Sequence, residues 1–145
     1  MEIYSIGFTQ RTASDFFGTL RAAGIKQLMD VRLNNTSQLS AFAKRDDLAY
    51  FLQEICGAEY VHEPLLAPTQ EMLDAYKKRK GDWSEYERDF FALMRERAIE
   101  AKLNPAHFSE PTVLLCSERT AEQCHRRLVL EYLASAWGDV SIRHL

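Results

Sequence analysis

The sequence lacks every segment that would place it in or across a membrane. No apolar run reaches the ~20 residues that a bilayer-spanning helix needs. The first residues, Met1 to Tyr4, show neither the basic start nor the long apolar stretch of a secretory signal. We therefore expect a cytoplasmic protein without a membrane partner, whose three cysteines are reduced thiols.

A basic surplus is also missing. The chain has 18 Lys and Arg residues against 21 Asp and Glu residues, which gives a formal net charge of -3. Proteins that coat nucleic acid usually carry an excess of positive charge. Nucleic acid is therefore not a favoured partner, although this balance still allows a local basic pocket.

Three well-known ligand motifs are absent from the sequence. They are the phosphate-loop pattern G-x-x-x-x-G-K-[ST], the dinucleotide pattern G-x-G-x-x-G and the hydrolase elbow G-x-S-x-G. Their absence disfavours nucleotide hydrolysis, dinucleotide redox chemistry and the usual esterase chemistry. We predict that the protein needs no cofactor.

What the sequence does contain is the length and composition of a single folded domain over residues 1–145. Hydrophobic residues make up 46% of the chain and charged residues 27%, as is ordinary for a globular protein. A chain of this length buries enough surface to fold without a metal or a disulfide. No internal repeat or linker divides it.

Strands and helices alternate along the chain. Strands are predicted at 2–6, 25–31, 60–62, 112–116 and 140–144, and helices at 12–23, 46–56, 69–80, 84–103 and 120–137. Thr12, Thr69 and Thr120 are the predicted N-caps, and the polar stretch 33–44 is a predicted loop. This order predicts an α/β three-layer sandwich, with a mainly parallel sheet of about five strands, helices on both faces and a Rossmann-like topology. Ligands of such sheets bind beyond the carboxyl ends of the strands.

Candidate ligand-binding residues follow the first two strands. Gly7 permits a close backbone approach, and Thr9 and Arg11 come directly after it, with Arg11 facing either a ligand or solvent. Asp30 and Arg32 lie two apart on the second strand and point to one face. They either pair with each other or leave Arg32 free to hold a phosphate or carboxylate.

The densest group of functional residues follows the fourth strand. It consists of Cys116, Ser117, Glu118, Arg119, Cys124, His125 and Arg126. Cys124 is expected in the first turns of the next helix, where the dipole lowers the pKa of a thiol and free backbone N–H groups bind anions. Arg119 and Arg126 add positive charge, and Glu118 either pairs with an arginine or acts as a general base.

Three interpretations compete for the thiols in this group. A structural zinc site needs four ligands at spacings such as C-x₂-C, but Cys116 and Cys124 are eight apart, so we predict no metal. A nucleophilic thiol needs a histidine in contact. His125, next to Cys124 on a predicted helix, points about 100° away, so His62 at the third strand end is the better partner. In the third interpretation Cys116 is a buried, inert thiol.

Taken together, several short motifs resemble the domain of unknown function 488 (DUF488) family nearly from end to end. They are Ile6-Gly7 with Thr9, Asp30-Val31-Arg32, Tyr60-Val61-His62, Trp83 with Tyr86, and Leu115-Cys116-Ser117-Glu118 before Cys124-His125-Arg126. The resemblance implies shared functional positions at Gly7, Thr9, Arg32, Cys116, Glu118, Cys124, His125 and Arg126. This chain departs from the family at Phe8, where many members have histidine, and in the loop after Arg32, which lacks a common proline.

Two functional hypotheses follow from these residues. In the first, the protein is an enzyme or binder for a small anionic ligand, nucleotide- or nucleobase-like, held by Arg32 and Arg126. Glu118 is then the acid or base, and Cys116 or Cys124 the nucleophile. In the second, the protein is a non-catalytic interaction module, in nucleic-acid maintenance, whose Glu118 and Arg126 form a structural ion pair. The sequence leaves both open, and it leaves the oligomeric state open too.

Overall fold

The computed structural model describes residues 1–145 and contains one sheet of five parallel strands. The strands are β1 (Glu2–Gly7), β2 (Gln27–Asp30), β3 (Glu59–His62), β4 (Thr112–Cys116) and β5 (Ser141–His144). They lie in the order β3-β2-β4-β1-β5. Because β4 lies between β2 and β1, segments that are far apart in the sequence end side by side. Gly7 is the register partner of Cys116, and Asp30 that of Leu115.

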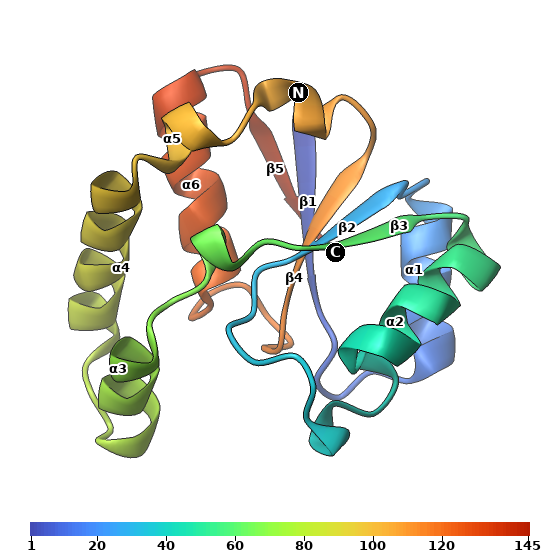
Figure 1. Cartoon of the computed structure of the whole chain (residues 1–145), viewed down its shortest axis with the longest axis horizontal. Coiled ribbons are helices and arrows are strands. Elements are labelled where there is room, and N and C mark those ends of the chain that lie inside the picture. Colours follow the sequence, from blue (N-terminus) through green and yellow to red (C-terminus); the bar gives the residue numbers. More distant parts are fainter.

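Helices cover both faces of this sheet (Figure 1). One face carries α1 (Ala13–Ala22) and α2 (Arg45–Phe51), and the other carries α4 (Trp83–Arg97), α5 (Ile99–Lys102) and α6 (His125–Trp137). A separate hydrophobic cluster fills each interface between sheet and helices. The predicted three-layer α/β architecture is therefore confirmed. No helix has the length and apolar character needed to cross a membrane.

Local capping signals explain where two of the helices begin. The hydroxyl of Thr12 accepts a hydrogen bond from the backbone N–H of Asp15 at the start of α1. Thr69 caps the short helix α3 (Gln70–Leu73) through the N–H of Met72 in the same way. Both N-caps were predicted, because each depends only on side chains within one helical turn.

Two predicted helices have different bounds in the structure. The helix predicted at 84–103 is interrupted at Ala98, which adopts a left-handed conformation (φ 51°) between α4 and α5. The helix predicted to start at Thr120 begins only at His125, and Cys124 is its N-cap. The chain from Ser117 to Gln123, here named the 117–123 loop, is thus irregular where a helical turn was predicted.

The topology opens a crevice at the carboxyl ends of the middle strands. From β2 the chain continues to α2 on one face, whereas from β4 it continues to α6 on the other face. Neighbouring strands whose connections diverge in this way leave a space between them, and ligands of open α/β sheets bind there.

Candidate functional site

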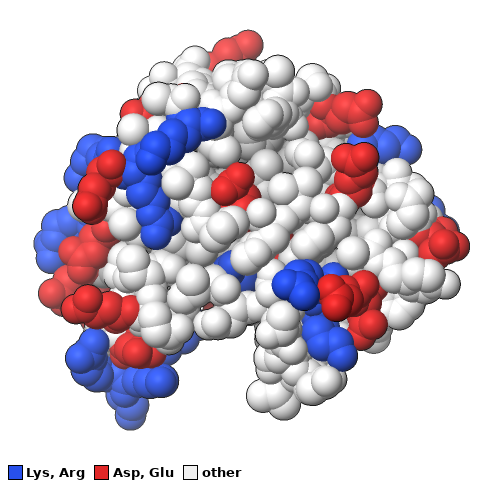
Figure 2. Space-filling view, in the orientation of Figure 1, with Lys and Arg blue, Asp and Glu red and all other residues white.

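A pocket of about 310 Å³ lies beyond the carboxyl ends of β2 and β4. The residues that line it include Arg32 after β2, Cys116 at the end of β4, and Ser117, Glu118, Cys124 and His125 after β4. The wall opposite the strand ends comes from the start of α4 and from residues 70–78. These residues, here named the arm 70–78, consist of α3 and the π-helical turn Asp74–Lys78. Figure 2 shows the surface hollowed between the end of this arm and the segment after β2. We call this space the strand-end pocket.

Arg32 is held rigidly at the pocket wall. Its Nε and Nη2 donate to the two carboxylate oxygens of Asp30, at 2.8 Å each, and Nη2 also donates to the carbonyl of Ala43 at 2.8 Å. The ring of Phe8 lies over the guanidinium group, with 5.3 Å between Cζ and the ring centroid. The remaining nitrogen, Nη1, is buried and has no hydrogen-bond partner in the protein.

Asp30 is the buried carboxylate that fixes this arginine. It also accepts a hydrogen bond of 2.5 Å from the hydroxyl of Tyr60 and one from the amide of Asn35. Burial alone would raise the pKa of Asp30, but hydrogen bonds and charge from Arg32 outweigh it, so the pKa lies below its usual value. Asp30 therefore stays ionised, and the orientation of Arg32 is set by the protein before any ligand arrives.

Cys116, Cys124 and His125 form a buried cluster at the floor of the pocket. The Sγ of Cys116 lies 3.5 Å from Nδ1 of His125, and the potential ligand atoms of all three residues lie within 4.8 Å of one another. The other ring nitrogen of His125, Nε2, is 2.7 Å from the carbonyl of Val31. Because a carbonyl only accepts, Nε2 carries the proton, and in the neutral ring Nδ1 offers its lone pair toward the thiols.

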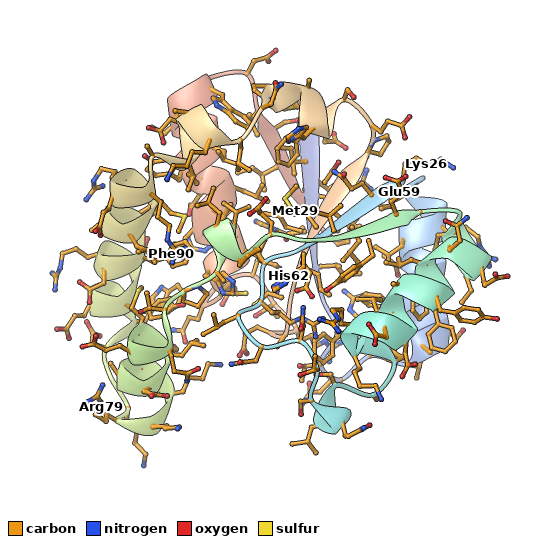
Figure 3. The ribbon with its side chains drawn as sticks, viewed as in Figure 1. Lys26, Met29, Glu59, His62, Arg79 and Phe90 are labelled. Carbon is orange, nitrogen blue, oxygen red and sulfur yellow. The ribbon has the colours of Figure 1, made fainter.

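The prediction that His125 points away from the thiols is wrong. It assumed helical geometry between Cys124 and His125, but Cys124 has extended dihedral angles (φ -138°, ψ 138°) and precedes the first helical residue. His62, the expected partner of the thiols, instead bonds through Nε2 to the carbonyl of Arg32 at 2.9 Å. Figure 3 shows His62 at the carboxyl end of β3, beside the segment that follows β2.

The two thiols of the cluster differ in acidity. The pKa of Cys116 is lowered, first by a hydrogen bond from Cys124 and, against its burial, also by the charge of Arg126 and the backbone N–H groups of Ser117 and Glu118. The pKa of Cys124 is raised, chiefly by burial. Cys116 is therefore the thiol that ionises first.

Arg126 is fully buried behind the cluster and holds the 117–123 loop in place. Its Nη1 donates to the carbonyl of Glu118 at 2.6 Å and approaches Sγ of Cys124 at 3.5 Å, and its Nε donates to the hydroxyl of Ser5 at 3.1 Å. The ion pair expected between Arg126 and the Glu118 carboxylate is absent. That carboxylate lies 2.5 Å from Nζ of Lys77, across the pocket mouth.

Gly7 and Thr9 support the loop rather than line the pocket. A Cβ at Gly7 would lie 1.5 Å from the carbonyl oxygen of Glu118, so only glycine lets the loop approach β1 so closely. The hydroxyl and the N–H of Thr9 both donate to the carbonyl of Ser117, at 2.6 and 3.1 Å. Both residues therefore act on the position of the loop.

Two further predicted ligand-binding residues lie away from the pocket. Arg11 donates to the carbonyl of Leu145 at 2.9 Å and pairs with Asp15 at 3.2 Å. Arg119 is exposed and reaches only Gln10, at 3.5 Å. Neither lines the strand-end pocket.

Sequence reasoning missed the wall of the pocket that lies opposite the strand ends. It includes Tyr76, Lys77, Trp83 and Tyr86. Trp83 and Tyr86, which belong to the family motifs but not to the functional positions that the resemblance implies, are stacked with 5.2 Å between their ring centroids. Tyr86 lies at helical spacing from Phe90 and Met94, which is typical of core packing, and Lys77 belongs to the basic run 77–80, which is typical of a solvated helix end. No local signal ties these residues to the cysteines, because their contact depends on the long connection between β3 and β4.

Comparison with known proteins identifies a family. The model of the family described as "Domain of unknown function DUF488" matches residues 12–133 of the chain. None of the curated proteins and none of the solved structures matches it.

Proposed function

This chain belongs to the DUF488 family, and from that premise we propose that it binds a small anionic ligand in the strand-end pocket and presents it to the thiols and imidazole at the floor. The family description assigns no reaction, so the proposal rests on the pocket itself. The ligand class is a phosphate or carboxylate joined to a flat ring, as in a nucleotide or a modified nucleobase. Three features of the pocket support it.

The observation that carries the proposal is the free Nη1 of Arg32. A buried polar group without a partner costs about 1–3 kcal/mol, and more when it is charged. Two of the three guanidinium nitrogens are already satisfied by Asp30 and Ala43. An anion in the pocket would supply the missing acceptor at a cation whose orientation is already fixed, so little entropy is lost on binding.

The aromatic residues that line the pocket support a flat ring as the second part of the ligand. Trp83 and Tyr76 are each half-buried, and their rings pack with 5.5 Å between centroids. Flat heteroaromatic rings stack favourably on such side chains. A pocket of about 310 Å³ is at the small end of the range for ligand sites, which suits one ring and one anionic group.

Lys77 and Glu118 control the mouth of the pocket in this proposal. Both side chains are about half exposed and pair with each other across the opening. An entering anion competes with Glu118 for Lys77, and Glu118 then becomes free to exchange a proton with the ligand. This gives Glu118 the acid or base role only after binding.

Thermal-shift measurements with a panel of anions test the proposal. The panel contains inorganic phosphate, simple carboxylates and nucleoside monophosphates, and the protein is wild type or Arg32→Lys, which keeps a cation beside Asp30 but removes the free N–H. We expect one class of anion to raise the Tm of the wild type, with at least tenfold weaker binding to the variant. Arg45→Lys is the control, because Arg45 pairs with Asp46 on the surface at the start of α2 and does not line the pocket.

Two results would overturn the proposal. One is equal stabilisation of wild type and Arg32→Lys by every anion that binds. The other is the absence of any stabilising anion, which would favour the rival function, an interaction module in which the buried cluster is structural. If Arg32→Lys does not fold, Trp83→Ala replaces it. Trp83 is half-buried, and its removal tests whether the ring of the ligand stacks on this side chain.

A further inference from the structure

We propose that Cys116, Cys124 and His125 bind one zinc ion, with a fourth coordination position that opens into the strand-end pocket. The sequence alone predicted no metal here, because the spacing of the cysteines matches no common zinc pattern. The structure removes that objection, since the ligand atoms of the three residues lie within 4.8 Å of one another. The inference does not depend on the identity of the anionic ligand proposed above.

The distances within the cluster fit a tetrahedral ion. Zinc binds sulfur at about 2.3 Å and imidazole nitrogen at about 2.0–2.1 Å, so the sulfur and nitrogen of one tetrahedral site lie about 3.5–3.6 Å apart. The Sγ of Cys116 and Nδ1 of His125 are 3.5 Å apart. These two ligands need no rearrangement to share one ion.

The surroundings of His125 match those of a metal-bound histidine. Histidine ligands almost always donate their other ring N–H to a carbonyl or carboxylate, which fixes the ring orientation and the tautomer. Here Nε2 donates to the carbonyl of Val31 at 2.7 Å, and Nδ1 is left to face the thiols. The ring also packs against Phe90 of α4, with 5.5 Å between centroids.

Charge around the cluster is arranged for two thiolates and a dication. On binding, each thiol gives up one proton to solvent, and no electron is transferred. Two thiolates and one Zn²⁺ sum to zero, which is the charge state a buried site tolerates best. Nη1 of Arg126, 3.5 Å from Sγ of Cys124, stabilises that sulfur ligand as a thiolate.

The open position points to a reactive rather than a purely structural metal. Structural zinc sites have four protein ligands, whereas catalytic sites have three and leave the fourth position to water or substrate. The cluster has three members, and all three line the same pocket as Arg32. A water molecule or the anionic group of a ligand would complete the coordination, and Arg32 lies on the wall beside it. Soft thiolate ligands favour zinc over magnesium or calcium.

Metal analysis of the purified protein tests the inference directly. After incubation with zinc and dialysis, we expect one zinc per chain, and after replacement by cobalt the absorption bands of a tetrahedral thiolate complex. Cys116→Ser, Cys124→Ser and His125→Gln should each weaken zinc binding at least 100-fold in a chelator competition. Cys56→Ser is the matched control, because Cys56 lies outside the cluster and should bind zinc like the wild type.

X-ray absorption on the wild-type protein keeps the inference testable even if the variants do not fold. We expect two sulfur neighbours at about 2.3 Å and one nitrogen at about 2.0 Å, with a light atom in the remaining position. Zinc below 0.1 equivalent after loading would overturn the inference, as would unchanged affinity in Cys116→Ser. A disulfide between Cys116 and Cys124 in the protein purified without reductant would appear as a mass lower by two hydrogens. If that protein still bound no zinc after reduction, this would overturn the inference too.

The two proposals fail independently. Arg32→Lys should still bind zinc at wild-type affinity, because Arg32 is not a member of the cluster. Zinc binding in a protein that no anion stabilises would retain the metal site and remove the anion proposal. Anion binding without zinc would do the reverse and leave Cys116 as a free thiol in the pocket.

Discussion

At Gly7 the missing side chain is what brings β1 and the 117–123 loop together. The register partner of Gly7 on β4 is Cys116, and a carbonyl of the loop occupies the space that a Cβ would need. The carbonyl belongs to Glu118, and Arg126 binds it from the other side at 2.6 Å. One glycine therefore positions the backbone immediately after the thiol of Cys116.

Gly7→Ala should destabilise the protein by about 3 kcal/mol, because a Cβ 1.5 Å from the oxygen of Glu118 must push the loop away. Gly18→Ala is the control, since nothing lies within 4 Å of a Cβ there and the position is within α1. It should stabilise the helix by about 0.5–1 kcal/mol. Chemical denaturation measures both, and similar free energies of unfolding for the two variants would contradict the steric argument.

Residue chemistry at the strand ends was predictable, but the side-chain partners were not. Arg32 was correctly expected after β2 and Cys116 at the end of β4, because strand ends follow from the hydrophobic pattern. Whether Arg32 pairs with Asp30 or stays free was left open, and the structure has both, with one nitrogen unpaired. Pairings such as that of Cys116 with His125 depend on backbone angles at single residues, which composition and spacing do not specify.

The start of a helix was predicted correctly where only local side chains determine it, and wrongly where distant residues bind the same backbone. Thr12 and Thr69 cap helices as expected, because nothing else competes for their hydroxyls. Thr120 carries an equally good capping pattern, but its segment is held open by distant groups. Thr9 binds the carbonyl of Ser117, and Arg126 binds those of Glu118 and Arg119. These contacts fix the backbone that leads into Thr120, and the carbonyl of Glu122, inside the predicted first turn, accepts a hydrogen bond from Nε of Arg127 at 3.1 Å.

Ala98 interrupts what the apolar pattern predicted as one long helix. A non-glycine residue in the left-handed region costs about 1–2 kcal/mol, and Ala98 has φ 51°. The break lets Ile99 turn into the cluster under α6, where it is fully buried. Packing of one large side chain therefore outweighs the local preference for a continuous helix.

Replacing Ala98 by glycine should stabilise the protein by about 0.5–1 kcal/mol, because glycine adopts the left-handed conformation without strain. Ala92→Gly, at an exposed position inside α4, should instead cost about 1 kcal/mol. The two substitutions are chemically identical, so opposite signs in urea denaturation isolate the backbone effect. Destabilisation by both would show that the break is not strained.

On the scale of the whole molecule, the pocket lies where the two helical layers separate. The side with α1 and α2 contributes Arg32 through the segment after β2, and the side with α4 and α6 contributes His125 and the aromatic wall. The sheet order that joins them, β3-β2-β4-β1-β5, brings together residues about 90 positions apart. A parallel sheet was predictable from alternating strands and helices, but the strand order was not, since several orders satisfy the same alternation.

The arm 70–78 is the least firmly held wall of this pocket. No residue of α3 or of the turn Asp74–Lys78 is fully buried. The side-chain bonds from the arm to the 117–123 loop are the ion pair of Lys77 with Glu118 and a 3.1 Å hydrogen bond from Tyr76 to Gln123. Local opening should therefore cost little free energy here compared with α4, whose inner face is buried.

Hydrogen exchange should register this difference and its cause. We expect amides of the arm to exchange faster than those of α4, and Glu118→Gln to speed their exchange by up to about 5-fold, since a half-exposed ion pair contributes at most about 1 kcal/mol. Asp47→Asn is the control, because it removes the partly exposed ion pair with Lys44 at the start of α2 and neither residue lines the pocket. Equal exchange rates of the arm amides in the two variants would mean that apolar contacts, and not the ion pair, hold the arm against the rest of the protein.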